Sequence, residues 1–198
     1  MKFQAVMLLP LIAIGALAQS TDTKSAEAIT PSERLVWFAQ STVGPASLTG
    51  GLISAGFGTL LNRPREYGTH WEGFGDRYGM RLTGVATSNA MEAGLGALWG
   101  EDPRYYRAGR DEAFGKRVGH IVKWTFIAAN SNGTVQPAYA RYAAIAGNNF
   151  LSNTWREHSE ANTTVALERT GLGFAARMAG NTFEEFWPDL KQKMFHRH

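Results

Sequence analysis

The chain contains no cysteine, which excludes disulfide bonds and every metal site that needs thiolate ligands. Charged residues make up only 19% of the sequence, and the formal net charge of +3 is too small to indicate a nucleic-acid-binding surface. The apolar run over 6–18 is shorter than the roughly 20 residues of a typical transmembrane helix. The 198 residues are enough for one domain with a core of its own.

No catalytic or cofactor-binding motif is complete in the sequence. His70-Trp71-Glu72 contains the H-x-E of zinc deaminases, but the cysteine pair of those sites is missing. The stretch 52–56 begins with Leu, where a serine nucleophile elbow begins with Gly. The glycines over 68–75 lack the Lys-Ser/Thr of a phosphate-binding loop. The sequence therefore predicts no metal and no cofactor, and it favours a protein that is not an enzyme.

The first 18 residues have the pattern of a signal peptide. Lys2 gives a positive start, the run over 6–18 is almost wholly apolar, and Ala16-Leu17-Ala18 fits the small-x-small rule for cleavage. We expect cleavage after Ala18, a polar linker over 19–30 and one folded domain over 31–198. The sequence thus predicts export to the periplasm or outer envelope of a bacterium.

The central segment over 77–100 has the spacing of a long helix. Apolar and small residues recur there at three- and four-residue steps, and proline is absent. Gly100 is placed to end this helix, and Pro103 prevents its continuation. Because a glycine inside a helix costs about 1 kcal/mol relative to alanine, we expect Gly79 and Gly84 to lie where another helix approaches closely.

Further helices are predicted before and after this segment. The first covers 33–42 with Ser32 as its cap, and a second, over 45–61, carries no charge, which indicates burial or contact with lipid. The others are expected over 112–129, over 137–155 and at the end of the chain, where Pro188 should interrupt the last helix. The predicted fold is an all-α, single-domain bundle of about five to seven helices with crossings lined by glycine and alanine.

A dense charged and aromatic turn follows the central helix. Its arginines alternate with tyrosines and acids, and guanidinium groups suit both carboxylates and phosphates. One interpretation is a structural lock in which Asp102 pairs with Arg104 or Arg107. The alternative is a small-molecule or anion site, or an enzyme, that uses the turn over 102–110. The candidate residues for the two interpretations are Asp102, Arg104, Tyr105, Arg107, His70, Asn149 and Asn153.

Two other polar groups could serve either purpose. Glu184, Glu185 and Asp189 form a carboxylate cluster, which we expect to be a solvated face or to pair with Arg177 and Lys191. The asparagines over 148–153 are unusual in an apolar helix, and buried amides need partners. We expect them to bond to the polar residues over 87–89 of the central helix.

The turn and three other segments resemble an uncharacterised family of exported bacterial proteins. Its members share a glycine-containing helix that starts with Tyr-Gly, an Asp-Pro-Arg-Tyr-aromatic turn, an Asn-aromatic segment and a Glu-Phe-x-Pro-Asp end. The matching parts here are Tyr78 to Gly84, Asp102 to Arg107, Gly147 to Asn153 and Glu184 to Asp189. The family often has His-Gln before the turn, whereas this chain has Gly100-Glu101. The resemblance implies an envelope location and a single helical domain, and no activity.

These observations lead to two hypotheses about function. The first is a non-enzymatic envelope protein that packs against a membrane surface or an envelope protein partner, without nucleic acid. A contiguous exposed apolar surface would support it. The second is a ligand-binding protein or enzyme, which a deep pocket that joins the arginines of the turn to His70 and the asparagines would support.

Overall fold

The computed structural model describes residues 28–195, and most of this range is helical. The predicted signal peptide, 1–18, and most of the predicted linker lie outside the described residues. The described α-helices are α2 (Pro31–Val43), α3 (Pro45–Leu60), α4 (Trp71–Trp99), α5 (Phe114–Phe126), α6 (Tyr139–Leu151) and α7 (Thr163–Phe195). Short 3₁₀ helices, η1 (Arg65–Tyr67) and η2 (Ser152–Thr154), follow α3 and α6. The prediction of a single all-α bundle is confirmed.

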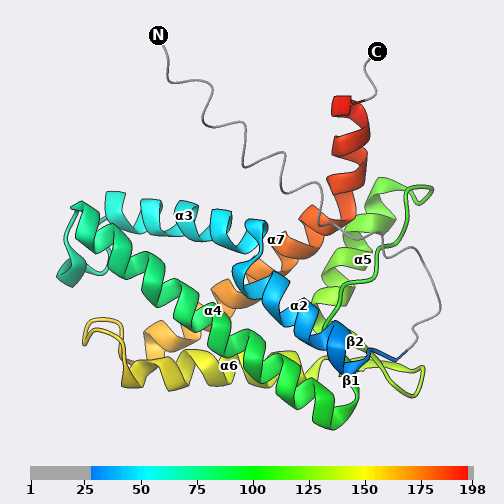
Figure 1. The fold of residues 1–198 in the computed structure, drawn as a ribbon, viewed down its shortest axis with the longest axis horizontal. Coiled ribbons are helices and arrows are strands. Elements are labelled where there is room, and N and C mark those ends of the chain that lie inside the picture. The colour runs from blue at the N-terminus through cyan, green and yellow to red at the C-terminus, as the bar shows by residue number, and fades with distance from the viewer. Residues whose placement is uncertain (1–27, 196–198) are drawn as a thin grey trace.

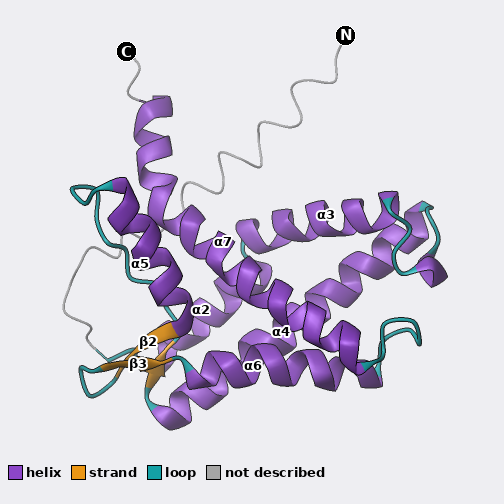
Figure 2. Ribbon diagram, turned by 180° about the vertical axis from the view of Figure 1, so that it is seen from behind, coloured by secondary structure: helices purple, strands orange, loops and turns teal. Residues whose placement is uncertain are grey.

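Helix α4 organises the arrangement of the others. It packs against α6 along one side and against α2 and α3 along the other (Figure 1). Helix α7 packs on α6 and α5 and crosses the opposite face of the molecule, which Figure 2 shows from the front. Helices α2 and α3 thus form one face of the protein, and α7 lies on the other.

A small antiparallel sheet, which the sequence analysis did not predict, joins the helices at one end. It has the order β1 (Glu101–Asp102), β2 (Ile127–Asn130) and β3 (Val135–Pro137), with Glu101 opposite Asn130. The helix predicted over 112–129 therefore ends at Phe126. The reason lies outside that helix, because Arg141 donates hydrogen bonds to the carbonyls of Trp124, Thr125 and Ile127.

Local signals explain where several helices begin and end. Thr30, and not Ser32, caps α2, because its Oγ accepts a hydrogen bond from the Glu33 backbone while the Glu33 carboxylate accepts one from the Thr30 backbone. Gly100 follows α4 with a φ of 77°, a left-handed conformation that glycine adopts readily, so this prediction is confirmed.

The close helix crossings use other glycines than the two predicted. A Cβ on Gly79 would meet nothing within 4 Å, and one on Gly84 would make only ordinary contacts of 3.8 Å or more. The expectation of a crossing is therefore wrong for Gly79, whereas Gly84 faces Asn148 of α6 without a tight approach. A Cβ on Gly51 of α3 would come within 2.7 Å of Tyr78, and one on Gly173 of α7 within 2.7 Å of Ile145.

Helix α7 runs through Pro188 without interruption, contrary to the prediction. Proline removes one hydrogen bond of the helix ladder and crowds the preceding turn. Here Arg117 donates to the backbone carbonyl of Glu185 at 2.7 Å, and Arg110 donates to the carbonyl of Pro188 at 3.0 Å. Side chains from outside the helix thus bind backbone carbonyls at Pro188 and in the turn before it. Among the residues that the structure describes, no helix is both long and apolar enough to cross a bilayer.

Candidate functional site

The interior of the protein is unusually rich in charged side chains. Among the described residues, the largest fully buried side chains are those of Arg141, Glu185, Thr125 and Ser152. The buried apolar residues are mostly alanines, with Tyr105, Ile121, Ile145 and Trp187 as the larger ones. Buried charges are stable only when they are paired and hydrogen-bonded, so the contacts of this network decide how the fold is held together.

The charged side chains of the turn after α4 pair with one another. Arg104 contacts both carboxylate oxygens of Asp102, with 2.7 Å between Nη2 and Oδ2, and it reaches Glu33 of α2 at 3.2 Å. Burial alone lowers the pKa of Arg104, but the hydrogen bonds and charge of Asp102 outweigh it and raise the pKa above its ordinary value. Tyr106 donates its hydroxyl to Asp102 at 2.8 Å. The carboxylate of Asp102 is thus occupied by partners from the turn itself.

A second buried group ties the turn to α7. Glu185 accepts hydrogen bonds from the Tyr105 hydroxyl at 2.9 Å and from the Ala108 backbone at 3.0 Å. Arg117 of α5 completes it, with 2.8 Å to Glu185 and 2.6 Å to Asp189. The prediction that these acids form a solvated face is therefore wrong for Glu185, which is 1% exposed.

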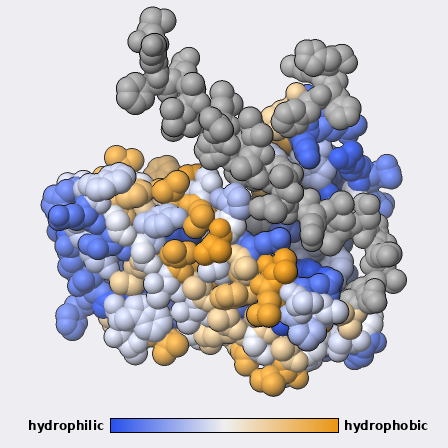
Figure 3. Space-filling view, viewed as in Figure 1, coloured by the Kyte–Doolittle hydropathy of each residue, from blue (hydrophilic) through white to orange (hydrophobic). Residues whose placement is uncertain are grey.

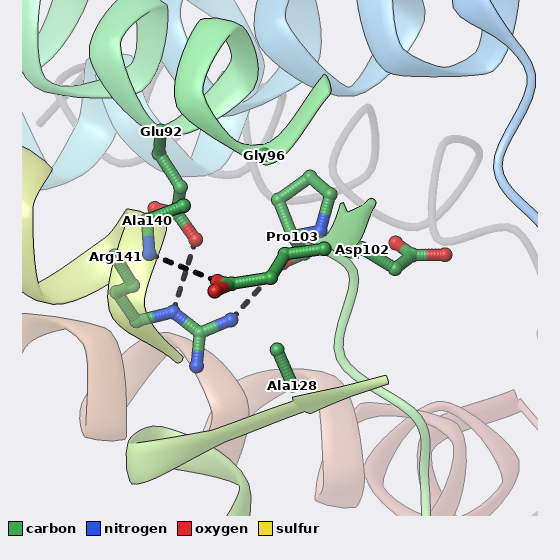
Figure 4. A pocket seen from close by; sticks show the side chains of 8 residues that line it. Glu92, Gly96, Asp102, Pro103, Ala128, Ala140 and Arg141 are labelled. Atoms are coloured by element: carbon green, nitrogen blue, oxygen red, sulfur yellow. Dashed lines mark hydrogen bonds and ion pairs between the residues drawn. The ribbon is translucent and has the colours of Figure 1, made fainter. Parts of the chain in front are cut away.

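A third group joins α4, α6 and α7 around Glu92. Arg141 and Arg177 both donate to one oxygen of Glu92, at 3.0 and 2.8 Å. Figure 4 shows the Arg141 side chain directed between Glu92 and Pro103, whose carbonyl also accepts from Arg177 at 2.6 Å. Burial lowers the pKa of Arg141 to about 10, and the charge of Arg177 acts in the same direction, against the effect of Glu92.

Glu101 is buried next to this group. Its carboxylate accepts a hydrogen bond from the Ala140 backbone at 2.9 Å, while its own carbonyl accepts one from Arg34 at 2.9 Å. Burial raises the pKa of Glu101, and the Ala140 bond opposes that shift. The pocket between Glu92, Glu101 and Arg141 has no room for a water molecule (Figure 4). This pocket therefore offers no space for a small molecule.

The remaining predicted site residues lie apart from one another. His70 precedes α4 and is exposed, whereas Asp102 follows the other end of that helix. With 29 residues, α4 is about 43 Å long. Arg107 is half-buried in the turn. The structure does not bring His70 and the turn together in one pocket.

The asparagines of α6 do not bond as predicted. The Asn149 amide donates to the Ile145 carbonyl, and Arg169 of α7 binds the Asn149 carbonyl at 3.0 Å and the Asn153 side chain at 2.6 Å. In the central helix, Asn89 donates to Thr42 of α2 instead. The expected bridge between the two helices is therefore wrong, because the Asn149 amide bonds within its own helix and the half-buried Arg169 supplies Asn153 with a partner.

Helix α3 presents its apolar side chains outward. Leu52, Ile53, Phe57 and Leu60 are all more than half exposed. The inward face consists of small residues, and a Cβ on Gly51 or Gly58 would collide with Tyr78 or Arg77 of α4. This pattern of large and small residues was present in the sequence and could have shown which face packs. Figure 3 shows apolar residues gathered over α3 and the adjoining α2.

Comparison of the chain with models of protein families, with curated proteins and with solved structures finds no match. Among residues 28–195, no three histidine or acidic side chains stand close enough to hold a metal ion. The function must therefore be argued from two features, a filled polar interior and an apolar outer face.

The raised pKa of the Tyr106 hydroxyl predicts a loss of stability at alkaline pH. Burial, followed by the charge of Asp102, raises the pKa of Tyr106 from 10 to about 12. The bond to Asp102 is therefore fully present below pH 10 and is lost as the pH rises through about 12. In thermal melts over this range, we expect the stability advantage of the wild type over Tyr106→Phe to shrink. The control Tyr139→Phe, at an exposed position, should show a constant difference. A constant difference for Tyr106→Phe would contradict the coupling.

Proposed function

We propose that the protein is an exported, non-enzymatic protein of the cell envelope that lies on a membrane surface through the outward face of α3 and the adjoining part of α2. The observation that carries this proposal is the inverted distribution of side chains, with charges buried and large apolar residues exposed. Extended exposed apolar patches are typical of contact with lipid or with a protein partner. The signal-peptide pattern of the first 18 residues supports export.

Helix α3 is the element best suited to lipid. It has 16 residues, none of them charged, and is about 24 Å long. A helix that lies in the membrane interface buries its apolar face among the lipids and turns its polar face away from them. Here the place of the polar face is taken by α4, whose Arg81 donates to the Ser47 carbonyl on the inner side of α3. The outer face is thus free for lipid.

The other long helix at the surface is less suitable. Helix α7 exposes Leu167 and Leu172, but Glu168 is also exposed on this part of the helix. Moving a charged side chain from water into the lipid chains costs free energy. We therefore assign the contact to the α2–α3 face and leave α7 away from the membrane.

Flotation of the full chain with phosphatidylcholine vesicles tests this proposal. Wild-type protein should float with the vesicles, whereas Ile53→Glu/Phe57→Glu should remain in solution, because each carboxylate would have to enter the lipid boundary. Both positions are exposed, so the substitutions should leave the thermal melt unchanged within a few degrees.

The matched control is Leu172→Glu, an exposed leucine of α7 on the other side of the molecule, which should float like the wild type. Equal flotation of all variants would show that α3 is not the contact. The other outcome is that the wild type stays in solution as a dimer that Ile53→Glu/Phe57→Glu dissociates. This result would show that the outward face of α3 contacts a second copy of the chain and not a membrane.

A further inference from the structure

A cleft of about 290 Å³ opens where α3 ends and α4 begins. Leu60, Trp71 and Phe74 give it an apolar lining, and Thr69 and His70 add polar groups. The rings of Trp71 and Phe74 stack with 5.1 Å between their centroids. Its volume is near the lower end of the roughly 300–1,000 Å³ of ligand pockets, enough for part of an apolar chain. The cleft continues the outward face of α3 at the level of Leu60.

Gly56 keeps this cleft open. A Cβ on Gly56 would meet nothing within 4 Å, although a glycine inside a helix costs about 1 kcal/mol relative to alanine. Gly51 and Gly58 of the same helix are explained by close contacts with α4, and Gly56 is not. Any larger side chain at this position would project into the space of the cleft. The absence of a side chain at Gly56 thus leaves this space open to a ligand.

Two arginines on the loop after α3 have unbalanced charge. Arg63 and Arg65 are exposed, and within the described part of the chain neither guanidinium has an acidic or hydrogen-bonding partner. The acid of the same loop, Glu66, lies near Ser159 and His158. Two positive charges thus lie on the segment that joins α3 to α4, the two helices between which the cleft opens.

The buried side chain of Arg77 fixes this loop. It donates to the carbonyls of Arg63, Pro64 and Gly68 at 2.7 to 2.8 Å. These bonds hold the backbone that carries the two free arginines against the start of α4. The backbone from which the two arginine side chains extend is therefore fixed by the fold.

We propose that the cleft binds one anionic phospholipid, with an acyl chain against Leu60, Trp71 and Phe74 and the headgroup phosphate on Arg63 and Arg65. Guanidinium groups bind phosphate oxygens with charge-assisted hydrogen bonds, and acyl chains need an apolar lining. This inference rests on the proposed function, because the outward face of α3 brings the cleft to the lipid. The inference adds that the protein prefers anionic lipids to neutral ones within the membrane.

The experiment compares binding of the full chain to vesicles of phosphatidylcholine alone and of phosphatidylcholine with phosphatidylglycerol. Wild-type protein should bind the anionic vesicles roughly tenfold more tightly or more, as two arginines near an anionic surface predict. Arg63→Gln/Arg65→Gln should lose most of this preference and keep the affinity for phosphatidylcholine. Gly56→Phe, whose Cβ would meet nothing within 4 Å and whose ring would occupy the cleft, should also lose this preference.

The control for Gly56→Phe is Gly79→Phe, where a side chain also meets nothing within 4 Å but lies away from the cleft. It adds the same exposed ring and should keep the wild-type preference. Phosphatidylglycerol with brominated acyl chains should quench a component of the tryptophan fluorescence that is missing from Trp71→Phe. Gly56→Phe should reduce that quenching, since its ring occupies the space of the chain.

The outcomes separate this inference from the proposed function. Binding to phosphatidylcholine without any gain from phosphatidylglycerol, or an intact gain in Arg63→Gln/Arg65→Gln, would overturn the lipid site and leave the membrane contact standing. An intact preference with unchanged quenching in Gly56→Phe would show general attraction to anionic surfaces and overturn the cleft as the site. No binding to either kind of vesicle would overturn both.

Discussion

Glu185→Ala is expected to lower the free energy of unfolding by about 3–5 kcal/mol, the usual cost of removing one partner of a buried ion pair. The substitution leaves Arg117 facing an empty site with only Asp189 as an acidic partner, and it removes the acceptor of the Tyr105 hydroxyl. Denaturant unfolding followed by circular dichroism measures the loss.

The control for this prediction is Glu168→Ala on the same helix. Glu168 is exposed, and a substitution there should change the free energy of unfolding by less than about 0.5 kcal/mol. Similar stability of the two variants would mean that solvent screens the contact between Arg117 and Glu185. The side-chain exposures of 8% and 0% argue against such screening.

Glu92→Ala should have an effect of similar size for a different reason. One carboxylate oxygen accepts from both Arg141 and Arg177, so its removal leaves two guanidinium groups close together without their shared acid. We expect a loss of about 3–5 kcal/mol, measured by the same unfolding experiment. Asp76→Ala, an exposed acid of the same helix, should be close to the wild type.

The pairing can be separated from loss of packing by a double variant. Glu92→Met/Arg141→Met removes both charges and keeps most of the buried volume, so it should lose less than the sum of the two single losses. Simple addition of the two losses would show that Glu92 and Arg141 act independently. Arg141 also binds three carbonyls at the end of α5, so the double variant should not regain wild-type stability.

The sequence predicted the elements whose signals are local. The helical spacing over 77–100, the stop at Gly100 and the division between the helices predicted over 33–42 and 45–61 were read from neighbouring residues, and the structure agrees with each. A Cβ on Gly44 would lie 2.1 Å from the Gln40 carbonyl, so only glycine fits at this break.

The buried network could not be predicted because its partners are far apart in the chain. Arg141 and Arg117 carry no local mark that separates them from exposed arginines, and their acids are 49 and 68 residues away. The same holds for β2, since Ile-Ala-Ala-Asn has little strand preference and is held by β1 and Arg141. The ion pair of Asp102 with Arg104 was among the alternatives because those residues are neighbours in the sequence.

Helix α7 has a consequence for the order in which the chain can fold. It supplies Arg177 and Glu185, whose partners Glu92 and Arg117 come 85 and 68 residues earlier. Contacts at such separation form late, because a large loop must close first. While the chain is synthesised, Glu92 and Arg117 therefore lack these partners until Arg177 and Glu185 have appeared. The buried network stays incomplete until then, which suits passage through a membrane before folding, as the proposed export requires.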